Sequence, residues 1–186
     1  LIAAQTRHCL DTLAQILQEQ GSSLDRVLKA EVHLADAADF YEFKLAWREY
    51  FPQDPPARTT VEVGDTFPFR GARLNLDAVA LAGDSRLARQ VLRDPDGPDP
   101  LEAECASWAV RAGNLVFCSA FAAIDFKTGL AAGKKPGFPN YGNDAVAQAQ
   151  HFFDALNRVL GQAGTSLEHA LEAYLYEPDL KTFYDV

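Results

Sequence analysis

The chain has 186 residues, of which 48% are hydrophobic and 23% charged, and its formal net charge is −9. This composition is typical of a globular protein with enough apolar side chains for a core, and it argues against disorder. The negative charge predicts no nucleic-acid partner, since it would repel phosphate backbones, and no apolar run approaches the roughly 20 residues of a membrane span.

Three cysteines, Cys9, Cys105 and Cys118, lie in no Cys-x-x-Cys motif and in no Cys/His cluster with metal-ligand spacing. An odd number of unclustered thiols predicts a reducing compartment and no structural metal. No stretch combines a basic start, an apolar run and a small-residue cleavage site, so we expect no signal peptide and a cytoplasmic location.

The first three predicted elements are a helix, a strand and a second helix. Apolar residues recur at helical spacing through residues 2–20, and Gly21 provides a C-terminal stop. Residues 27–34 alternate between apolar and polar, which predicts a half-buried strand. Asp36 is placed to cap a second helix, whose apolar residues at helical spacing include Phe40, Phe43 and Trp47.

Two further strands are predicted at residues 58–63 and 73–81, because β-branched or alternating apolar residues dominate both segments. The glycine- and proline-containing stretch between them predicts a hairpin. Residues 83–104 have the composition of a linker. Strand-like segments follow at residues 107–112 and 115–124, and another helix is predicted from near residue 145.

The sequence also repeats itself at an offset of 143 residues, which aligns residues 1–43 with residues 144–186 without a gap. An offset this long is the period of a duplicated domain. We interpret the chain as a piece of a longer protein with two incomplete copies, in residues 1–82 and 105–186, joined by the linker. Joining the halves gives an α+β sandwich with two helices on one face of a mostly antiparallel sheet.

Two motifs carry a family resemblance. Residues 56–63 read Pro-Ala-Arg-Thr-Thr-Val-Glu-Val and precede Leu-Asn-Leu-Asp-Ala-Val-Ala at 74–80, which resembles the C-terminal motif of the YjgF/RidA family, also labelled endoribonuclease L-PSP. Residues 113–119 read Gly-Asn-Leu-Val-Phe-Cys-Ser and precede Lys-Thr-Gly at 127–129, which is similar to that family's N-terminal motif. The resemblance covers nearly the whole chain.

The resemblance implies a chorismate-mutase-like fold, a trimer or pseudo-hexamer, and ligand sites at subunit interfaces. It also implies hydrolysis of 2-aminoacrylate-type imino acids to 2-oxo acids and ammonia, without a cofactor. The expected partners are therefore a small imino or oxo acid and further copies of the chain, with no nucleic acid and no membrane.

Arg58 is the residue best suited to this chemistry, since a guanidinium offers a planar fork for a substrate carboxylate. The alternative is an ordinary ion pair with Glu62 or Asp77. The resemblance implies that Thr60, Asn75 and Ser119 complete the binding site.

Asn75 stands where active imine deaminases of the family commonly have glutamate, and an amide cannot shuttle a proton at neutral pH. Two further functions therefore stay open. One is a non-catalytic module that binds small carboxylates, and the other, which the charge disfavours, is a ribonuclease.

Overall fold

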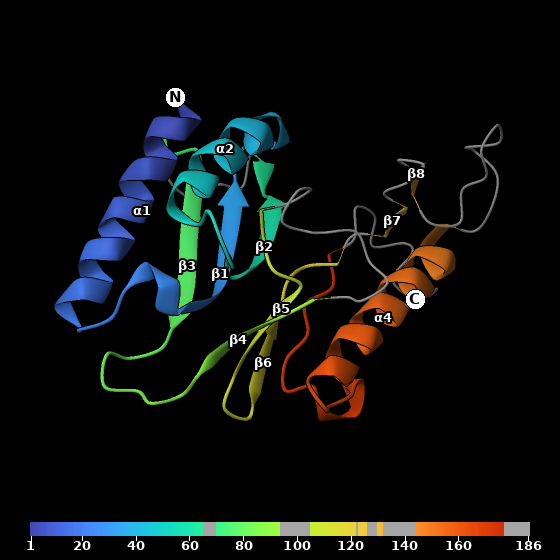
Figure 1. The fold of residues 1–186 in the computed structure, drawn as a ribbon. Helices are drawn as coiled ribbons and strands as arrows, with labels where there is room; N and C mark the ends of the chain where they lie inside the picture. Colours follow the sequence, from blue (N-terminus) through green and yellow to red (C-terminus); the bar gives the residue numbers. More distant parts are fainter. Residues whose placement is uncertain (65–69, 94–104, 122, 126–129, 132–143, 177–186) are drawn as a thin grey trace. The chain divides into compact units, whose positions relative to one another are not determined.

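The computed structural model describes residues 1–64, 70–93, 105–121, 123–125, 130–131 and 144–176 (Figure 1). The chain divides into two compact units. Unit 1 comprises Leu1–Arg93 and Asp99–Ala120, and unit 2 comprises Asp94–Pro98 and Phe121–Val186. No helix in the described ranges is long and apolar enough to cross a membrane.

Unit 1 begins with two helices over a three-stranded mixed sheet. The elements are α1 (Ile2–Glu19), β1 (Val27–Leu34), α2 (Phe40–Tyr50), β2 (Ala57–Glu62) and β3 (Leu74–Ala80). The strand order is β2-β1-β3, with β2 parallel and β3 antiparallel to β1. Figure 1 shows both helices on one face of this sheet. The predicted α+β class is confirmed, and this arrangement is consistent with a chorismate-mutase-like fold.

The predicted hairpin between β2 and β3 is wrong. Both strands pair with β1, and β1 separates them. The reason is the connection through α2, which carries the chain from the end of β1 back over the sheet so that β2 runs parallel to β1, as helical crossovers do.

Local sequence signals explain the ends of the helices. After α1 the chain turns at Gly21, whose φ of 68° is the left-handed conformation that favours glycine. Gly83 packs directly against this turn, because a Cβ on Gly83 would lie only 2.3 Å from the carbonyl oxygen of Gly21. Before α2, the Asp36 carboxylate accepts a hydrogen bond from the backbone N–H of Ala38 and caps a short 3-10 helix, Ala37–Asp39.

The main core lies between the two helices and one face of the sheet. An aromatic row on α2 dominates it, with the Phe43 and Trp47 rings 5.7 Å apart and the Trp47 and Phe51 rings 4.5 Å apart. The buried apolar residues packed with this row come from α1 and the strands, and include Ile2, Leu10, Val27, Ala30, Val32, Leu34 and Leu74.

A second, antiparallel sheet also belongs to unit 1. Its strands are β4 (Arg89–Leu92), β5 (Ala109–Ala112) and β6 (Leu115–Cys118), in that order. Thus Arg89–Leu92, which composition placed in the linker, forms a strand, and the rest of the expected linker from residue 94 lies outside the described residues. The division into 1–82, 83–104 and 105–186 stays a prediction.

Unit 2 contains a two-stranded sheet and a long helix. The elements are β7 (Ile124–Asp125), β8 (Leu130–Ala131), α4 (Asp144–Gln162) and the 3-10 helix η4 (Leu167–His169). The helix predicted near residue 145 is confirmed.

Candidate functional site

Arg58 lies on β2 and points into the core between the sheet and α2. Its side chain is nearly closed to solvent, with 4% of the residue exposed. The guanidinium carbon is 5.0 Å from the centroid of the Trp47 ring, 5.1 Å from that of Phe43 and 6.0 Å from that of Phe40. Aromatic faces attract cations, and the attraction strengthens when water is excluded. The rings therefore form one wall of a cationic site.

Thr60 belongs to the same site. It lies two residues beyond Arg58 and so on the same face of the strand. The Nε–H of Arg58 donates a hydrogen bond of 3.0 Å to the Thr60 hydroxyl. This bond fixes one edge of the guanidinium, and it orients the plane of the group relative to the aromatic wall.

Ser119 supports Arg58 from the backbone side. The Arg58 N–H donates a 2.8 Å hydrogen bond to the Ser119 hydroxyl, which in turn donates to the carbonyl of Ser107. The next residue, Ala120, donates its N–H to the Arg58 carbonyl at 3.1 Å. Both backbone groups of Arg58 are therefore held by the segment that follows β6.

Asn75 does not join this group. In the sheet register Arg58 is the partner of Ala30, whereas Asn75 is the partner of His33. Since residues 30 and 33 of one strand face opposite sides, Asn75 lies on the face away from Arg58. The hairpin prediction also implied that Arg58 and Asn75 occupy adjacent strands, and this is wrong because β1 lies between β2 and β3. The structure brings together three of the four predicted residues.

Asp77 shares its face of β3 with Asn75, as the strand alternation predicts. The Asn75 amide donates to the Asp77 carboxylate at 3.4 Å. An ion pair between Arg58 and Asp77 is therefore incompatible with the register of unit 1.

Lys29, which the sequence did not mark as special, makes two part-buried hydrogen bonds through its side chain. Its ammonium donates to the Thr59 hydroxyl and to the Cys118 carbonyl, both at 2.6 Å. Burial lowers the pKa of Lys29 and raises that of the Cys118 thiol to about 11. Alternation placed Lys29 on the outer face of its strand, but no pattern within the strand shows that β6 covers that face.

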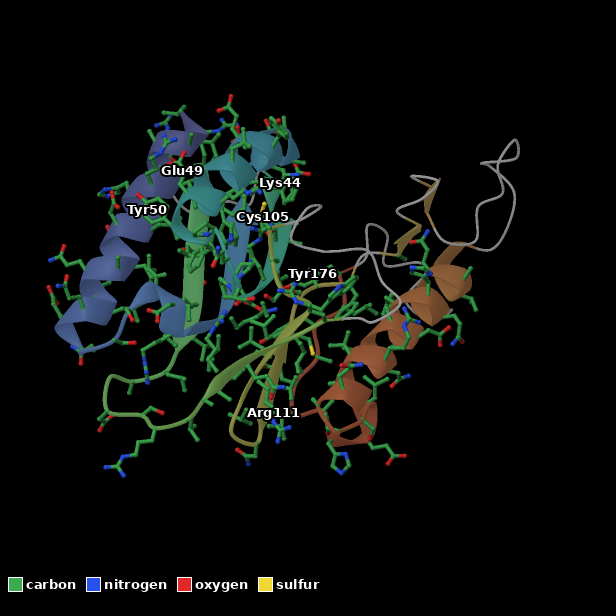
Figure 2. The ribbon with its side chains drawn as sticks, viewed as in Figure 1. Lys44, Glu49, Tyr50, Cys105, Arg111 and Tyr176 are labelled. Carbon is green, nitrogen blue, oxygen red and sulfur yellow. The ribbon has the colours of Figure 1, made fainter. Side chains whose placement is uncertain are left out.

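The helical spacing of Phe40 and Trp47 indicates an apolar helix face, and both residues pack in the main core. Their contact with Arg58 was not predicted, because the spacing of apolar residues within a helix or a strand does not show how the helix packs on the sheet. The Trp47 indole N–H also donates to the carbonyl of Cys105 at 3.0 Å. Figure 2 labels Cys105 close to α2.

The described residues contain no group of three or more histidine, cysteine or acidic side chains arranged to hold a metal ion.

Comparison with known proteins places the first part of the chain in a family. Residues 1–82 match the family described as Endoribonuclease L-PSP. Over 82 residues the chain is 37% identical to the mitochondrial protein mmf1 of Schizosaccharomyces pombe, covering 43% of this chain and 50% of that protein. Over 62 residues it is 45% identical to the 3-aminoacrylate deaminase RutC of Acinetobacter baylyi, covering 33% of this chain and 49% of RutC.

Among solved structures, a YjgF-family protein from Neisseria meningitidis is 28% identical, with a TM-score of 0.42, over 45% of this chain and 70% of that one. The chain spans about half the length of the two curated relatives. The matched segment contains α1, α2 and β2, the strand that carries Arg58. Residues 1–82 of this chain therefore belong to the endoribonuclease L-PSP family.

Proposed function

We propose that this protein hydrolyses 2-imino acids and their enamine tautomers to 2-oxo acids and ammonia, with Arg58 as the anchor for the substrate carboxylate. The observation that carries the proposal is the position of the Arg58 guanidinium, which is buried against three aromatic rings and oriented by Thr60. Arg58 lies within residues 1–82, which match the L-PSP family. The chain is also similar over 62 residues to the deaminase RutC, whose named substrate, 3-aminoacrylate, is an enamine acid.

The reaction needs little more than positioning. Water adds through oxygen to the carbon of the C=N bond and gives a carbinolamine. One proton of the water passes to nitrogen as the carbinolamine forms. The carbinolamine hydroxyl then gives its proton to the nitrogen as the C–N bond breaks, so that ammonia leaves while the C=O bond forms. Holding the carboxylate in a fixed orientation places the electrophilic carbon for this attack, and such positioning supplies a large part of a rate enhancement.

Burial strengthens the anchor. A bidentate bond between a guanidinium and a carboxylate is a charge-assisted interaction of about 1.5–3 kcal/mol, and low water content around the rings reduces screening. The Ser119 hydroxyl holds the Arg58 backbone, so the guanidinium enters the site from a fixed point on β2.

The position of Asn75 favours a second candidate, a module that binds small carboxylates without turnover. Asn75 lies on the sheet face opposite Arg58 and carries no titratable proton at neutral pH. In this second candidate the anchor is retained and the proton-transfer group is missing.

The test generates 2-iminopropanoate with an amino-acid oxidase and follows release of pyruvate and ammonia in the presence of the purified protein. We expect accelerated release by the parent, and loss of at least tenfold in kcat/KM for Arg58→Ala. Arg58→Lys should restore only part, because it keeps the charge but not the planar fork. Arg48→Ala, an exposed arginine on α2, is the matched control and should behave as the parent.

Stability must be measured alongside activity. A substitution at a surface position shifts the free energy of unfolding by only about 0.5 kcal/mol. Arg58 is buried against three rings, so loss of its side chain is expected to lower that free energy by about 1–3 kcal/mol. Thr60→Val keeps the shape of the side chain and removes only the hydroxyl, so it should weaken 2-oxobutanoate binding severalfold in a folded protein.

Two outcomes would contradict the proposed hydrolysis or the proposed role of Arg58. If 2-oxobutanoate binds the parent in an Arg58-dependent manner but pyruvate release is not accelerated, the carboxylate-binding module is the correct function. If folded Arg58→Lys and Thr60→Val both bind 2-oxobutanoate as the parent does, Arg58 is not the anchor and the resemblance describes the fold alone.

A further inference from the structure

Unit 1 extends well past the segment that matches the L-PSP family. The match ends at residue 82, whereas the compact unit includes β4, β5 and β6 and continues to Ala120. The strands beyond the match are therefore part of the same compact unit as the segment that matches.

They cover the outer edge of the strand that carries Arg58. Ser107 forms a parallel bridge with Ala57, and its N–H donates to the Pro56 carbonyl at 3.2 Å. Its hydroxyl donates to the Pro55 carbonyl at 2.5 Å. On the same edge, Ala120 and Ser119 bond to the backbone of Arg58. Because an open strand edge exposes unpaired backbone groups, these bonds complete β2.

Further apolar and polar contacts join the strands beyond residue 82 to both faces of the first sheet. Leu28, Ala57 and Leu81 form one buried cluster with Val110 and Ala112 of β5. The Arg89 guanidinium donates to the carbonyl of Val27 at 2.8 Å. Cys105 is buried in the main core, where its carbonyl accepts the indole N–H of Trp47.

We propose that unit 1 is a hybrid domain, in which the C-terminal half of the first sequence copy binds the N-terminal strands of the second. The segment 113–119 carries the motif that resembles the family's N-terminal strands, whereas Arg58 belongs to the C-terminal motif. The edge of β2, strand β4 and the cluster around Leu28 are the binding surface, and residues 105–120, with β5 and β6, are its partner. On the proposed function, the carboxylate site is then shared between the two copies.

This arrangement assigns Ser119 a positioning role. Its hydroxyl bridges the Arg58 N–H and the Ser107 carbonyl, so it connects β2 to the added strands at the residue that carries the guanidinium. The side chain that meets the substrate comes from one copy, and the hydroxyl that holds its backbone comes from the other.

The experiment cuts the full chain after it has folded. A protease site is introduced within residues 94–104, the purified protein is cleaved, and the two pieces are examined by size-exclusion chromatography. We expect the pieces to elute together in native buffer and to separate only in urea. The nicked protein should bind 2-oxobutanoate within about twofold of the uncut protein. Pieces that separate in native buffer would overturn the hybrid domain.

Four substitutions in the nicked protein distinguish the possible failures. Val110→Asp places a charge in the shared apolar cluster, and it should weaken association of the pieces at least tenfold. Val146→Asp, at an exposed position of α4, is its control and should leave association unchanged. Ser119→Ala should keep the pieces together and weaken 2-oxobutanoate binding, with partial rescue by Ser119→Thr, which restores the hydroxyl.

The outcomes separate this inference from the proposed function. Pieces that stay together without any 2-oxobutanoate binding reject the function and leave the hybrid domain standing. An isolated N-terminal piece that binds 2-oxobutanoate as tightly as the nicked complex rejects the shared site. Unchanged 2-oxobutanoate binding in Ser119→Ala rejects the positioning role.

Discussion

Residues 2–34 of unit 1 and residues 144–176 of unit 2 begin alike and end differently. Each segment forms a long helix, α1 or α4, and then turns at a left-handed glycine, Gly21 with φ 68° or Gly164 with φ 71°. Each continues into a three-residue 3-10 helix, Leu24–Arg26 or Leu167–His169. All of these features recur at the offset of 143 residues.

The segments diverge where a strand would follow. In unit 1 the next residues form β1, which hydrogen-bonds to β2 on one side and β3 on the other. In unit 2 residues 170–176 form no strand and are exposed. Leu28 is 4% exposed, whereas Leu171, its counterpart in the repeat, is 86% exposed. Helix, stop and turn are therefore determined locally, and the strand depends on its partners.

The largest expected effect is the difference in stability loss between truncating Leu28 and truncating Leu171. Leu28→Ala removes a buried side chain from the cluster with Val110, and should lower the free energy of unfolding by about 2–5 kcal/mol. Leu171→Ala should change it by less than about 0.5 kcal/mol, because the side chain has little to lose. Urea denaturation followed by tryptophan fluorescence measures both. Similar losses at the two positions would show that residues 170–176 are packed in solution.

A smaller effect tests how closely the helix turn of unit 1 is packed. In Gly83→Ala the new Cβ would meet the backbone of Gly21 at 2.3 Å, and overpacking of this kind costs about 1–3 kcal/mol. Gly161→Ala, in α4, meets nothing within 4 Å and should stabilise the helix by roughly 0.5–1 kcal/mol. Thermal unfolding followed by circular dichroism should therefore show shifts of opposite sign. A neutral Gly83→Ala would contradict the close approach.

The smallest expected effect is a change in stability at alkaline pH that comes from Cys118 and Lys29. Residues 144–176 contain neither cysteine nor lysine. The pKa of Cys118 rises from 9.0 to about 11 in the folded chain. Between these values the unfolded chain has lost a proton that the folded chain keeps, so stability falls as pH rises. Burial lowers the pKa of Lys29, and the cost of burying its charge is relieved as pH rises, which opposes the loss.

Urea titrations between pH 8 and 10.5 measure these slopes. Between pH 9 and 10.5, Cys118→Ala should lose stability less steeply than the parent, and Lys29→Met should lose it more steeply. Parallel curves for all three proteins would show that neither group is buried as described.

Much of unit 1 was predictable from local patterns. The strand predicted at 27–34 matches β1, and the helix predicted at 2–20 differs from α1 by one residue. These predictions succeed because periodicity and glycine stops act over a few residues. The pairing of β2 was not predictable in this way, because a turn-like sequence between two strands does not reveal that both prefer β1.

The candidate site shows the same boundary between local and long-range information. The resemblance identified Arg58, Thr60 and Ser119, which the structure brings together. It also included Asn75, which the register of β1 places on the other face. The aromatic wall arises where α2 packs on the sheet, and the contacts of Lys29 arise where β6 approaches it. Neither contact can be predicted from the sequence of a single strand.

The order of strands in unit 1 also determines when the domain is completed on a ribosome. β2 ends at Glu62, but the residues that close its outer edge lie near Ala120. At about 5–20 residues per second, translation from Glu62 to Ala120 takes on the order of several seconds. Throughout that interval the outer edge of the Arg58 strand stays open on the nascent chain, whereas in the completed domain it is covered.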